Sequence, residues 1–418
     1  MKHRIATTSA VVLIAAALAG CGGEGQSSDT TEIVWWKLAE NSETANEVIA
    51  DLVEKFEAEN PDIRVSVEQR SGDPHQDALR TVAGTDGAPD IFFMWTGLGQ
   101  VGDIVDAGAS LDLTSYYKEL GWDEGMFSDS TLDTITQYGG HHGVPWQARA
   151  QGLFYNNMLF KQAGIDSPPE TFDELIEDSK ALLDAGITPF AFGGTVNWHV
   201  MRLLDNIMEA TCGPETFDAL RQLEANWSAE ACVTESFDLL TEFAGNYLNK
   251  GFISISNTEA FGELFAGNAA MGIEGDPFNQ LLRDNGQNED DWRVVSFPGV
   301  DRLYGFTTAN YISATSEHPD EAMRFLEFLA SEDPQRRITE VLGSRSVNLD
   351  ALPEGDRSDL DKSWDTIIDE ATGIFINSDQ ALPLNITTEL WRVQNAVITG
   401  ELQPSQAGAE MQRFIDGL

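Results

Sequence analysis

Hydrophobic and polar positions near the start of the folded chain predict a strand, an amphipathic helix and a second strand. Residues 32–36 form a compact apolar run rich in strand-forming residues. Between residues 45 and 56, apolar side chains recur at intervals of three and four, the spacing of one helical face. Pro61 should end this helix, because the residue before a proline disfavours the helical conformation. Residues 63–67 then alternate between apolar and polar, as a strand should.

The same succession of strands and helices continues along the chain. A helix is predicted near residues 76–83, and the continuous apolar run over 89–95 indicates a buried parallel strand. Thr171 and Glu174 have the spacing of a capping box that opens another helix, which a strand at 187–192 follows. This alternation predicts an α/β fold, and 418 residues exceed the usual size of one core, so we expect two lobes.

The N-terminus carries an export signal. A basic head precedes a short apolar run over residues 10–18, about half of the ~20 residues that a membrane-spanning helix needs. The Leu-Ala-Gly-Cys sequence ending at Cys21 resembles the lipobox of bacterial lipoproteins. We therefore expect a lipoprotein signal peptide at residues 1–20, a lipid anchor on Cys21 and a flexible tether over 21–31, with the protein held on the outer face of the cell membrane. The alternative is an ordinary signal peptide with a chance cysteine.

The charge of the chain limits the classes of partner that it can bind. There are 69 Asp and Glu residues against 25 Lys and Arg, a formal net charge of -44. Such a surface repels phosphate backbones and anionic lipids, so we expect no nucleic-acid partner and no membrane contact other than the lipid anchor. The acidic residues are spread along the chain without a long run, which is typical of a solvated surface.

Two cysteines remain in the body of the exported chain. Outside the cytosol, Cys212 and Cys232 are expected to form a disulfide. Zinc is the weaker interpretation, because neither has a second cysteine or a histidine at ligand spacing. We expect no metal and no cofactor.

Several blocks of sequence resemble, in order, the extracellular sugar-binding proteins of ABC importers, the maltose-binding-protein-like family 1 solute-binding proteins. Each block alone is weak, but their shared order over nearly the whole exported chain is specific. The blocks are 33–36 (IVWW), 56–67 (FEAENPDIRVSV), 87–93 (GAPDIFF), 144–157, 163–175, 269–278 and 313–329.

The resemblance implies a type II periplasmic-binding-protein-like fold, in which two α/β lobes joined by a multi-strand hinge close over a sugar and a membrane permease receives it. By analogy the chain crosses between lobes near 149–151, 305–307 and 331–337. Lobe 1 would then hold residues 32–149 plus 307–331, and lobe 2 residues 150–306 plus 332–418. A monomer is expected.

Tryptophans mark the candidate binding surface. A sugar ring offers a face of C–H groups to a flat aromatic ring and a rim of hydroxyls to polar side chains. Trp36 and Trp95 end predicted strands, Trp146 precedes the first crossing, and Trp198 follows a glycine-containing loop. We single out Trp95, Trp146 and Trp198, although any one tryptophan is more often a core residue.

Polar candidates lie beside the first crossing. The family places a charged residue where Arg149 stands, Gln147 lies beside it, and Glu40 follows the first strand. An arginine can bridge two adjacent hydroxyls through its fixed fork of donors, but a hinge salt bridge is an equal alternative.

Three further candidates rest on the resemblance. Asp276 and Phe278 stand where the family often has glycine followed by tryptophan; since that tryptophan is absent, either Phe278 stacks on the sugar or this subsite is missing. Trp391 lies where the family contributes aromatic residues from its last helices, with core packing as the alternative.

The function that follows is capture of a sugar, for which several aromatic candidates favour an oligosaccharide, without chemistry on it. A secreted glycoside hydrolase lipoprotein is one alternative, since many carboxylates are present, but no nucleophile elbow, phosphate loop or His-Glu-x-x-His motif appears. A binder of the same fold for peptides, polyamines or metals is the other.

Overall fold

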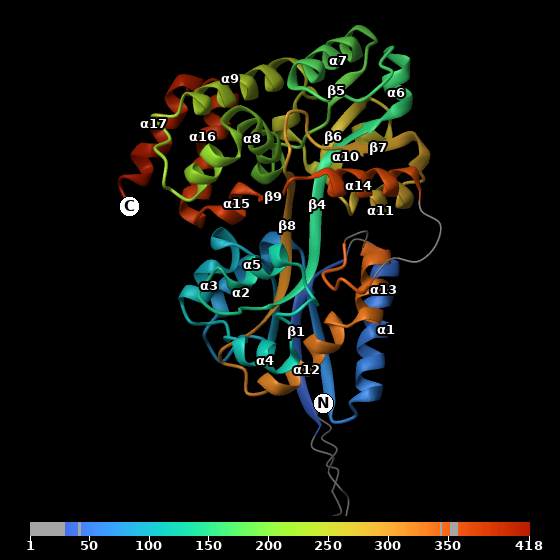
Figure 1. Cartoon of the computed structure of the whole chain (residues 1–418), viewed down its shortest axis with the longest axis vertical. Helices are drawn as coiled ribbons and strands as arrows, with labels where there is room; N and C mark the ends of the chain where they lie inside the picture. The colour runs from blue at the N-terminus through green and yellow to red at the C-terminus, as the bar shows by residue number, and fades with distance from the viewer. Residues whose placement is uncertain (1–29, 41–42, 343–344, 352–357) are drawn as a thin grey trace, which may run out of the picture.

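A computed structural model describes residues 30–40, 43–342, 345–351 and 358–418 of the chain. The expected signal peptide, Cys21 and most of the expected tether lie outside the described residues. The chain forms two lobes, one above the other, with the N-terminal end at the far end of lobe 1 (Figure 1). We expected the tether to extend to Thr31, but Thr31 is the first residue of the first strand.

In the part of the chain that the structure describes, nine strands are joined through one continuous hydrogen-bonded network, in the order β2-β1-β3-β8-β4-β6-β5, with β7 beside β4 and β9 beside β8. The strands are β1 (Thr31–Leu38), β2 (Ile63–Arg70), β3 (Ile91–Trp95), β4 (Val144–Asn156), β5 (Thr188–Phe190), β6 (Ala269–Gly275), β7 (Trp292–Val295), β8 (Leu303–Ile312) and β9 (Ile374–Ile376).

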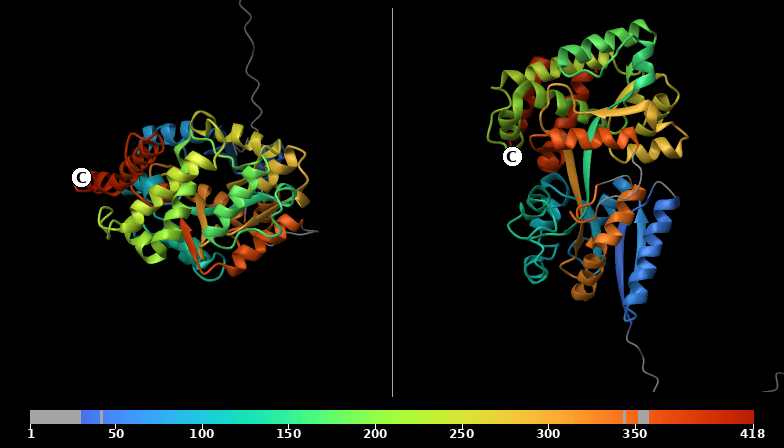
Figure 2. Two further views of the ribbon diagram at one scale, coloured as in Figure 1. Left: turned by 90° about the horizontal axis from the view of Figure 1, so that it is seen from above. Right: turned by 45° about the vertical axis from the view of Figure 1, so that its right-hand side comes forward.

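Strands β4 and β8 run through both lobes as an antiparallel pair (Figures 1 and 2). In lobe 1, β8 pairs with β3 through residues 308–312; in lobe 2 it pairs with β9 through residues 303–305. Strand β4 meets β6 only from Gln151 onward. Between these partners, β4 and β8 pair with each other, Ala148 also bridges Arg345, and this stretch is the hinge. The crossings expected near 149–151 and 305–307 fall there.

Lobe 1 builds its core around β1 and β3, with Trp35, Phe56, Phe92, Tyr311 and Phe325 buried in one cluster. In Figure 1, α1 and α13 lie to the right of its strands and α2 to α5 to the left. Its helical segments are α1 (Glu43–Glu59), α2 (Gly72–Val82), the π-turn η1 (Leu98–Gly102), α3 (Asp103–Asp106), α4 (Thr114–Leu120), α5 (Asp129–Thr136), α12 (Pro319–Ala330) and α13 (Glu332–Leu342).

Lobe 2 has two packed clusters, a large one between β5, β6 and the helices of residues 157–246 and 384–415, and a smaller one beside β7. Its helical segments are α6 (Asn157–Gln162), α7 (Phe172–Asp184), α8 (Asn197–Arg221), α9 (Ala231–Asn246), η2 (Phe252–Ser254), α10 (Asn257–Phe265), α11 (Phe278–Asp284), η3 (Glu289–Asp291), α14 (Asp359–Glu370), α15 (Ser378–Ala381), α16 (Leu384–Ile398) and α17 (Pro404–Ile415).

The third crossing lies later than expected. We placed it at 331–337 and assigned residues from 332 onward to lobe 2, but α13 packs on α1 in lobe 1. Ile338 belongs to the lobe-1 core, and Lys55 of α1 pairs with Asp333 at 2.8 Å. Ser331, in an extended conformation, separates α12 from α13. Lobe 1 continues to Leu349, whose N–H donates to the Met126 carbonyl, and α14 already belongs to lobe 2.

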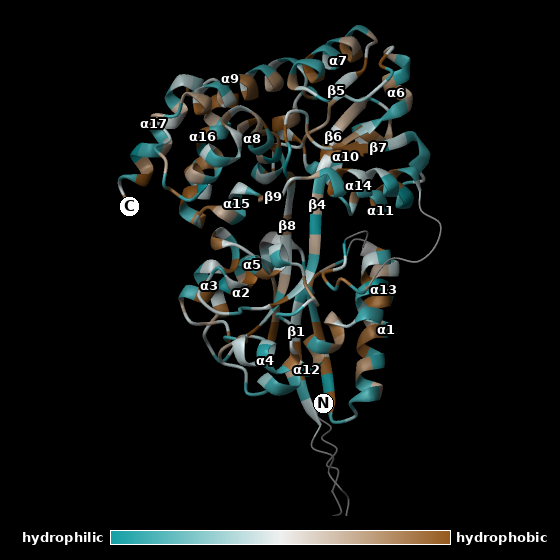
Figure 3. Cartoon of the chain, viewed as in Figure 1, coloured by the Kyte–Doolittle hydropathy of each residue, from teal (hydrophilic) through white to brown (hydrophobic). Residues whose placement is uncertain are grey.

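Local sequence signals explain several elements. The α1 helix buries Ala45, Ile49, Leu52 and Phe56 on one face, as the periodicity predicts, and its ribbon carries both hydrophobic and hydrophilic residues (Figure 3). The predicted capping box also forms: Thr171 Oγ1 accepts from the Glu174 N–H, and Glu174 accepts from the Thr171 N–H at 3.1 Å. These contacts fix where α7 begins.

A disulfide joins Cys212 in α8 to Cys232 in α9. The α8 helix is kinked directly after Cys212, where Gly213 takes φ 73° and Pro214 follows. The bond therefore ties the kink to the neighbouring helix. Among the described residues, no helix is long and apolar enough to cross a membrane.

Candidate functional site

The parallel strands of lobe 1 end toward the junction with lobe 2. Strands β1, β2 and β3 are parallel, and β3 ends at Trp95 opposite Thr308, close to the hinge. In α/β sheets, ligands bind beyond the carboxyl ends of the strands. The side chains at these ends, together with those of the hinge and of the facing part of lobe 2, form the candidate site.

On the lobe-1 side, two predicted residues already have protein partners. The Arg70 guanidinium stacks over the Trp36 ring at 3.7 Å, which covers one face of that tryptophan. Glu40 forms an ion pair with Lys37, whose side chain is 2% exposed, with 2.5 Å between Lys37 Nζ and Glu40 Oε1. Burial lowers the pKa of Lys37, and Glu40 opposes this shift. Trp95 is half-buried, with its ring edge-on to Phe93 at 5.2 Å.

The hinge holds a buried polar group of three predicted residues. Arg149 Nη2 donates to Gln147 Oε1 at 2.6 Å, and Arg149 Nη1 lies 3.8 Å from Asp276 Oδ1. Gln147 and Asp276 are 3% and 4% exposed. Among the described residues, Gln147 Nε2, Arg149 Nη1 and both carboxylate oxygens of Asp276 have no hydrogen-bond partner. Buried polar atoms of this kind are costly unless water or a ligand pairs with them.

Burial of Asp276 disfavours the charged form of its carboxyl group. Burial raises the pKa of the Asp276 carboxyl to about 7, although the positive charges of Arg149 and Arg345 act in the opposite direction. Burial also lowers the pKa of Arg149, against the pull of Asp276 and Glu40. The hinge group therefore offers both donors and acceptors to a polar molecule.

On the lobe-2 side, Trp198 lies in the first turn of α8, half-buried, with the Arg202 guanidinium 4.6 Å over its ring. Arg202 Nη1 donates to Glu274 Oε2 at 2.6 Å, and His199 Nε2 lies 2.8 Å from Glu274 Oε1. The N–H of Gly193 donates to His199 Nδ1, so the ring proton sits on Nε2 and faces Glu274. Burial opposes ionisation of Glu274, but Arg202 and His199 outweigh it and lower its pKa.

Trp391 lies beside the same turn of α8. It is half-buried in α16, and its indole N–H donates to Met201 Sδ at 3.2 Å. Asn395 Nδ2 also donates to Asn197 Oδ1 at 2.8 Å, so α16 holds the start of α8 in place. Trp391 thus shares a location with Trp198, within α16 (Leu384–Ile398).

Trp146 and Phe278, both predicted as candidate ligand contacts, are buried in the protein core, which fits the alternatives of core packing for Trp146 and of a missing subsite at Phe278. Trp146 is 3% exposed and packs edge-on against Trp35 at 5.7 Å, because the register of β4 shifts between Pro145 and Gln147. Phe278 is 2% exposed at the start of α11, within a ring cluster that contains Phe154, Phe261, Phe265 and Trp292.

Sequence reasoning missed Arg70, Lys37, His199, Arg202 and Glu274. Arg70 ends β2, so its place at a strand end was the one signal available. Lys37 lies near the end of β1, three residues before Glu40, so its position was also a local signal. His199, Arg202 and Glu274 are brought together from distant positions: Glu274 lies 75 residues from His199 and 72 from Arg202. No local spacing marks such a group.

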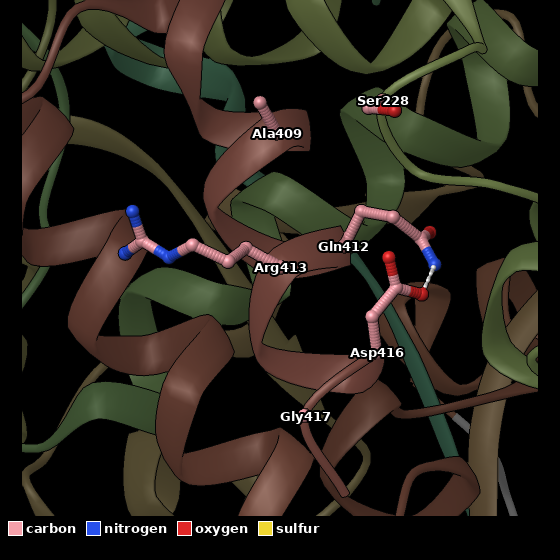
Figure 4. A pocket seen from close by; sticks show the side chains of 6 residues that line it. All are labelled: Ser228, Ala409, Gln412, Arg413, Asp416 and Gly417. Carbon is pink, nitrogen blue, oxygen red and sulfur yellow. Dashed lines mark hydrogen bonds between the residues drawn. The ribbon is translucent and has the colours of Figure 1, made fainter.

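A separate surface pocket lies away from this site, on the outer side of lobe 2 (Figure 4). Gln412 Nε2 donates to Asp416 Oδ1 at 2.7 Å within it. None of its residues belongs to the candidate site; they are Ser228, Ala409, Gln412, Arg413, Asp416 and Gly417. Among the described residues, no group of three His, Cys, Asp or Glu side chains is placed to hold a metal ion.

Comparisons with known proteins agree with this architecture. The family model of bacterial extracellular solute-binding proteins matches residues 36–336. An uncharacterised ABC transporter extracellular-binding protein of Pyrococcus horikoshii is 24% identical over 81% of this chain and 79% of that protein. The xylose/arabinose-binding protein XacG of Haloferax volcanii is 28% identical over 49% of this chain and 45% of that protein.

A solved structure of a chitin oligosaccharide binding protein superposes with a TM-score of 0.84 at 22% identity, over 93% of this chain and 99% of that one. The two-lobed α/β fold that the sequence predicts is therefore confirmed.

Asp276 should make the ligand-free protein less stable at high pH. Its folded pKa of about 7 lies above the ordinary value of 3.8. Between those values the folded chain holds more protons there than the unfolded chain, so stability falls as pH rises through this window. Asp276→Asn removes the titrating group. We expect the melting temperature of the variant, relative to wild type, to increase steadily from about pH 5 to about pH 8.

The control is Asp184→Asn, which neutralises an exposed carboxylate at the end of α7. Its melting temperature relative to wild type should change little with pH. If Asp276→Asn is less stable than wild type at about pH 8, the carboxylate stabilises the fold as an anion and our account of its environment is wrong.

Proposed function

The chain belongs to the family of bacterial extracellular solute-binding proteins, and from this membership we propose that it captures a sugar for an ABC importer. Proteins of this family are exported and bind solutes for transporters; they are not enzymes. The observation that carries the sugar assignment is the group of Gln147, Arg149 and Asp276. Their buried donors and acceptors without protein partners match the hydroxyl rim of a sugar ring.

Aromatic side chains near the junction supply the second half of a sugar site. Trp95, Trp198 and Trp391 are half-buried, and Trp36 is 9% exposed under Arg70. Their spread over both lobes supports an oligosaccharide rather than a single ring. Two similar proteins support the class: one is named as a binder of xylose and arabinose and the other as a binder of chitin oligosaccharides.

The mechanism we propose is conformational. The β4–β8 ribbon is the hinge, and the site draws Glu40 and Trp95 from lobe 1 and Trp198 and Asp276 from lobe 2. A sugar that pairs with groups of both lobes favours the closed arrangement, by the difference between its affinities for the closed and open forms. The closed monomer then docks on permease subunits in the membrane. The sugar leaves unchanged.

Anchoring follows from the N-terminal signal. We propose that Cys21 carries the lipid and becomes the first residue of the exported protein, and that the following polar residues tether the body to the outer face of the membrane. Support comes from the sequence around Cys21 and from the position of the N-terminal end, at the end of lobe 1 farthest from lobe 2 (Figure 1). A diacylglyceryl group provides the two chains that stable anchoring takes.

A thermal-shift panel tests the sugar assignment. The panel contains xylose, arabinose, xylo-oligosaccharides and chito-oligosaccharides, with peptides and polyamines as controls. A ligand at about 100 times its Kd adds about 2.7 kcal/mol, enough to raise the melting temperature. We expect a rise with one class of oligosaccharide and recovery of that sugar intact. Cleaved sugar would favour the hydrolase, and a response to peptides or polyamines alone would contradict the sugar assignment.

Trp198→Ala should weaken binding of the responding sugar by at least about tenfold, or about 1.4 kcal/mol, because a stacking face is lost. Trp146→Phe is the matched control: it alters a core ring and should lower the melting temperature while leaving affinity nearly unchanged. Isothermal titration measures both. Full affinity in a folded Trp198→Ala variant would remove Trp198 from the site.

Cys21→Ser should release the protein from membranes, because serine offers no sulfur for the lipid. Fractionation of cells that express each form, followed by immunoblotting, measures the membrane-bound share. We expect the wild type in the membrane fraction and the variant in the soluble exported fraction. Membrane association of the variant equal to wild type would contradict lipid anchoring at Cys21.

A further inference from the structure

One face of helix α8 carries a line of side chains that begins at Trp198 in the candidate site. Its members recur at intervals of four, three, four and three residues, the spacing of one helical face: Trp198, Arg202, Asp205, Glu209 and Cys212. The line ends at the disulfide, directly before the kink at Gly213. We call these five residues the α8 stripe.

The stripe is bonded to two strands of lobe 2. Arg202 Nη1 donates to Glu274 Oε2 in β6 at 2.6 Å. Tyr304 Oη in β8 donates to Asp205 Oδ2 at 2.8 Å. The Ser378 N–H and hydroxyl donate to the same carboxylate at 2.9 Å and 2.5 Å. The first half of α8 is thus tied to the sheet at two successive turns.

The far part of the stripe is held by an arginine and by the disulfide. Arg302, which directly precedes β8, donates from Nε and Nη2 to the two carboxylate oxygens of Glu209, each at 2.7 Å. The same guanidinium donates to Asp218 Oδ2 at 2.6 Å, beyond the kink of α8. Cys212 is bonded to Cys232 of α9. Arg302 therefore contacts both halves of the kinked helix.

Charged groups are unusual in a helix that is buried on all sides. Residues 199–209 are buried, except for Arg202, which is half-buried. Asp205 and Glu209 are 0% and 3% exposed. Burial raises the pKa of Asp205, although the hydrogen bonds from Ser378 act in the opposite direction. Apolar side chains of similar volume are often as good for stability as a buried ion pair, because each charge loses its hydration. Stability therefore does not explain why the stripe is charged.

Hydrogen-bonded charges fix the position of a helix more narrowly than apolar contacts do. An apolar face can still pack after a small rotation or shift of the helix, whereas a two-point ion pair requires its donor and acceptor atoms at about 3 Å. Glu209 lies 11 residues from Trp198 along α8, which is about 16 Å of helix. Its bonds to Arg302 can act on Trp198 only through the helix.

We propose that Glu209 and Arg302 are positioning residues of the candidate site, which hold α8 in the one rotation and depth that presents Trp198 at the junction between the lobes. The inference rests on the proposed function in taking the molecule bound there to be a sugar. Loss of the pair should weaken binding although neither residue touches the ligand.

A double variant, Glu209→Met with Arg302→Met, tests the positioning role. It removes both charges together and leaves unbranched apolar side chains, while Asp218 keeps its ion pair with Arg221. The melting temperature should equal or exceed that of wild type. The affinity for xylotriose or diacetylchitobiose, measured by isothermal titration, should fall at least about fivefold, because Trp198 is displaced. If the double variant does not fold, Arg302→Lys replaces it, since lysine keeps the charge without the two-point contact.

Acrylamide quenching of Trp198 fluorescence reports its position without any sugar. Trp198→Phe is made in wild type and in the double variant, and the difference in emission isolates the signal of Trp198 from those of the other tryptophans. In wild type the ring is half-buried under Arg202. We expect stronger quenching in the double variant, because the ring is no longer held there.

Two controls separate positioning from charge and from stability. Glu289→Met with Arg283→Met makes the same change at a more exposed ion pair and should alter neither affinity nor quenching. Leu240→Ala removes a buried side chain of α9 that lies outside the stripe. It should lower the melting temperature and leave affinity and quenching nearly unchanged.

If a probe sugar binds the wild type, both effects are required: unchanged affinity or unchanged quenching in the double variant overturns the positioning role. A fall in affinity that Leu240→Ala matches also overturns it, because general destabilisation then accounts for the loss. If neither sugar binds the wild type, the sugar assignment fails and the quenching alone decides: stronger quenching supports the positioning of Trp198, and unchanged quenching overturns it.

Discussion

The antiparallel pairing of β4 with β8 is the constraint on which the rest of the structure depends. These two strands run unbroken through both lobes, and every strand of the network connects to them directly or through one or two neighbours. Their register, with Arg149 opposite Phe306 and Gln151 opposite Tyr304, fixes which side chains stand at the crossing. Since strand side chains alternate between faces, a slip of one residue would exchange the buried hinge group for its neighbours. The site is therefore positioned by backbone hydrogen bonds before any side chain acts.

The charged side chains at the junction between the lobes differ in arrangement from those of the chain as a whole. The chain as a whole is strongly acidic, yet near the junction Lys37, Arg149 and Arg202 are each paired with a carboxylate. Where the network is saturated, as at Glu274, it holds a side chain in one orientation. Where it is left incomplete, as at Asp276, the folded protein carries a cost that a bound molecule can relieve. The same chemistry thus serves for rigidity in one place and for recognition in another.

Sequence reasoning succeeded where structure is set by near neighbours and failed where it is set by distant ones. The periodic face of α1, the capping box of α7 and the apolar run of β3 each depend on residues a few positions apart, so they could be predicted. The place of α13 could not, because its partner is α1, nearly three hundred positions earlier, as the contact between Arg337 and Asp51 shows. The burial of Trp146 likewise depends on Trp35, which no spacing reveals. For the candidate site, the sequence predicted which residues lie at strand ends and at the hinge. What surrounds each tryptophan ring could be known only from the fold.

The order in which the chain visits its lobes has a consequence for how the protein matures. Strand β3 is completed by β8, whose residues follow it by more than two hundred positions, and α12 and α13 come later still. Lobe 1 therefore lacks a sheet neighbour and two covering helices until about four-fifths of the polypeptide has been synthesised. Contacts between residues so far apart in the sequence form slowly, because the chain must lose the entropy of closing the loop before the contacts can stabilise it. A nascent chain with this topology stays unfolded for longer, which keeps it threadable through a translocation channel until it reaches the compartment where Cys212 and Cys232 can oxidise.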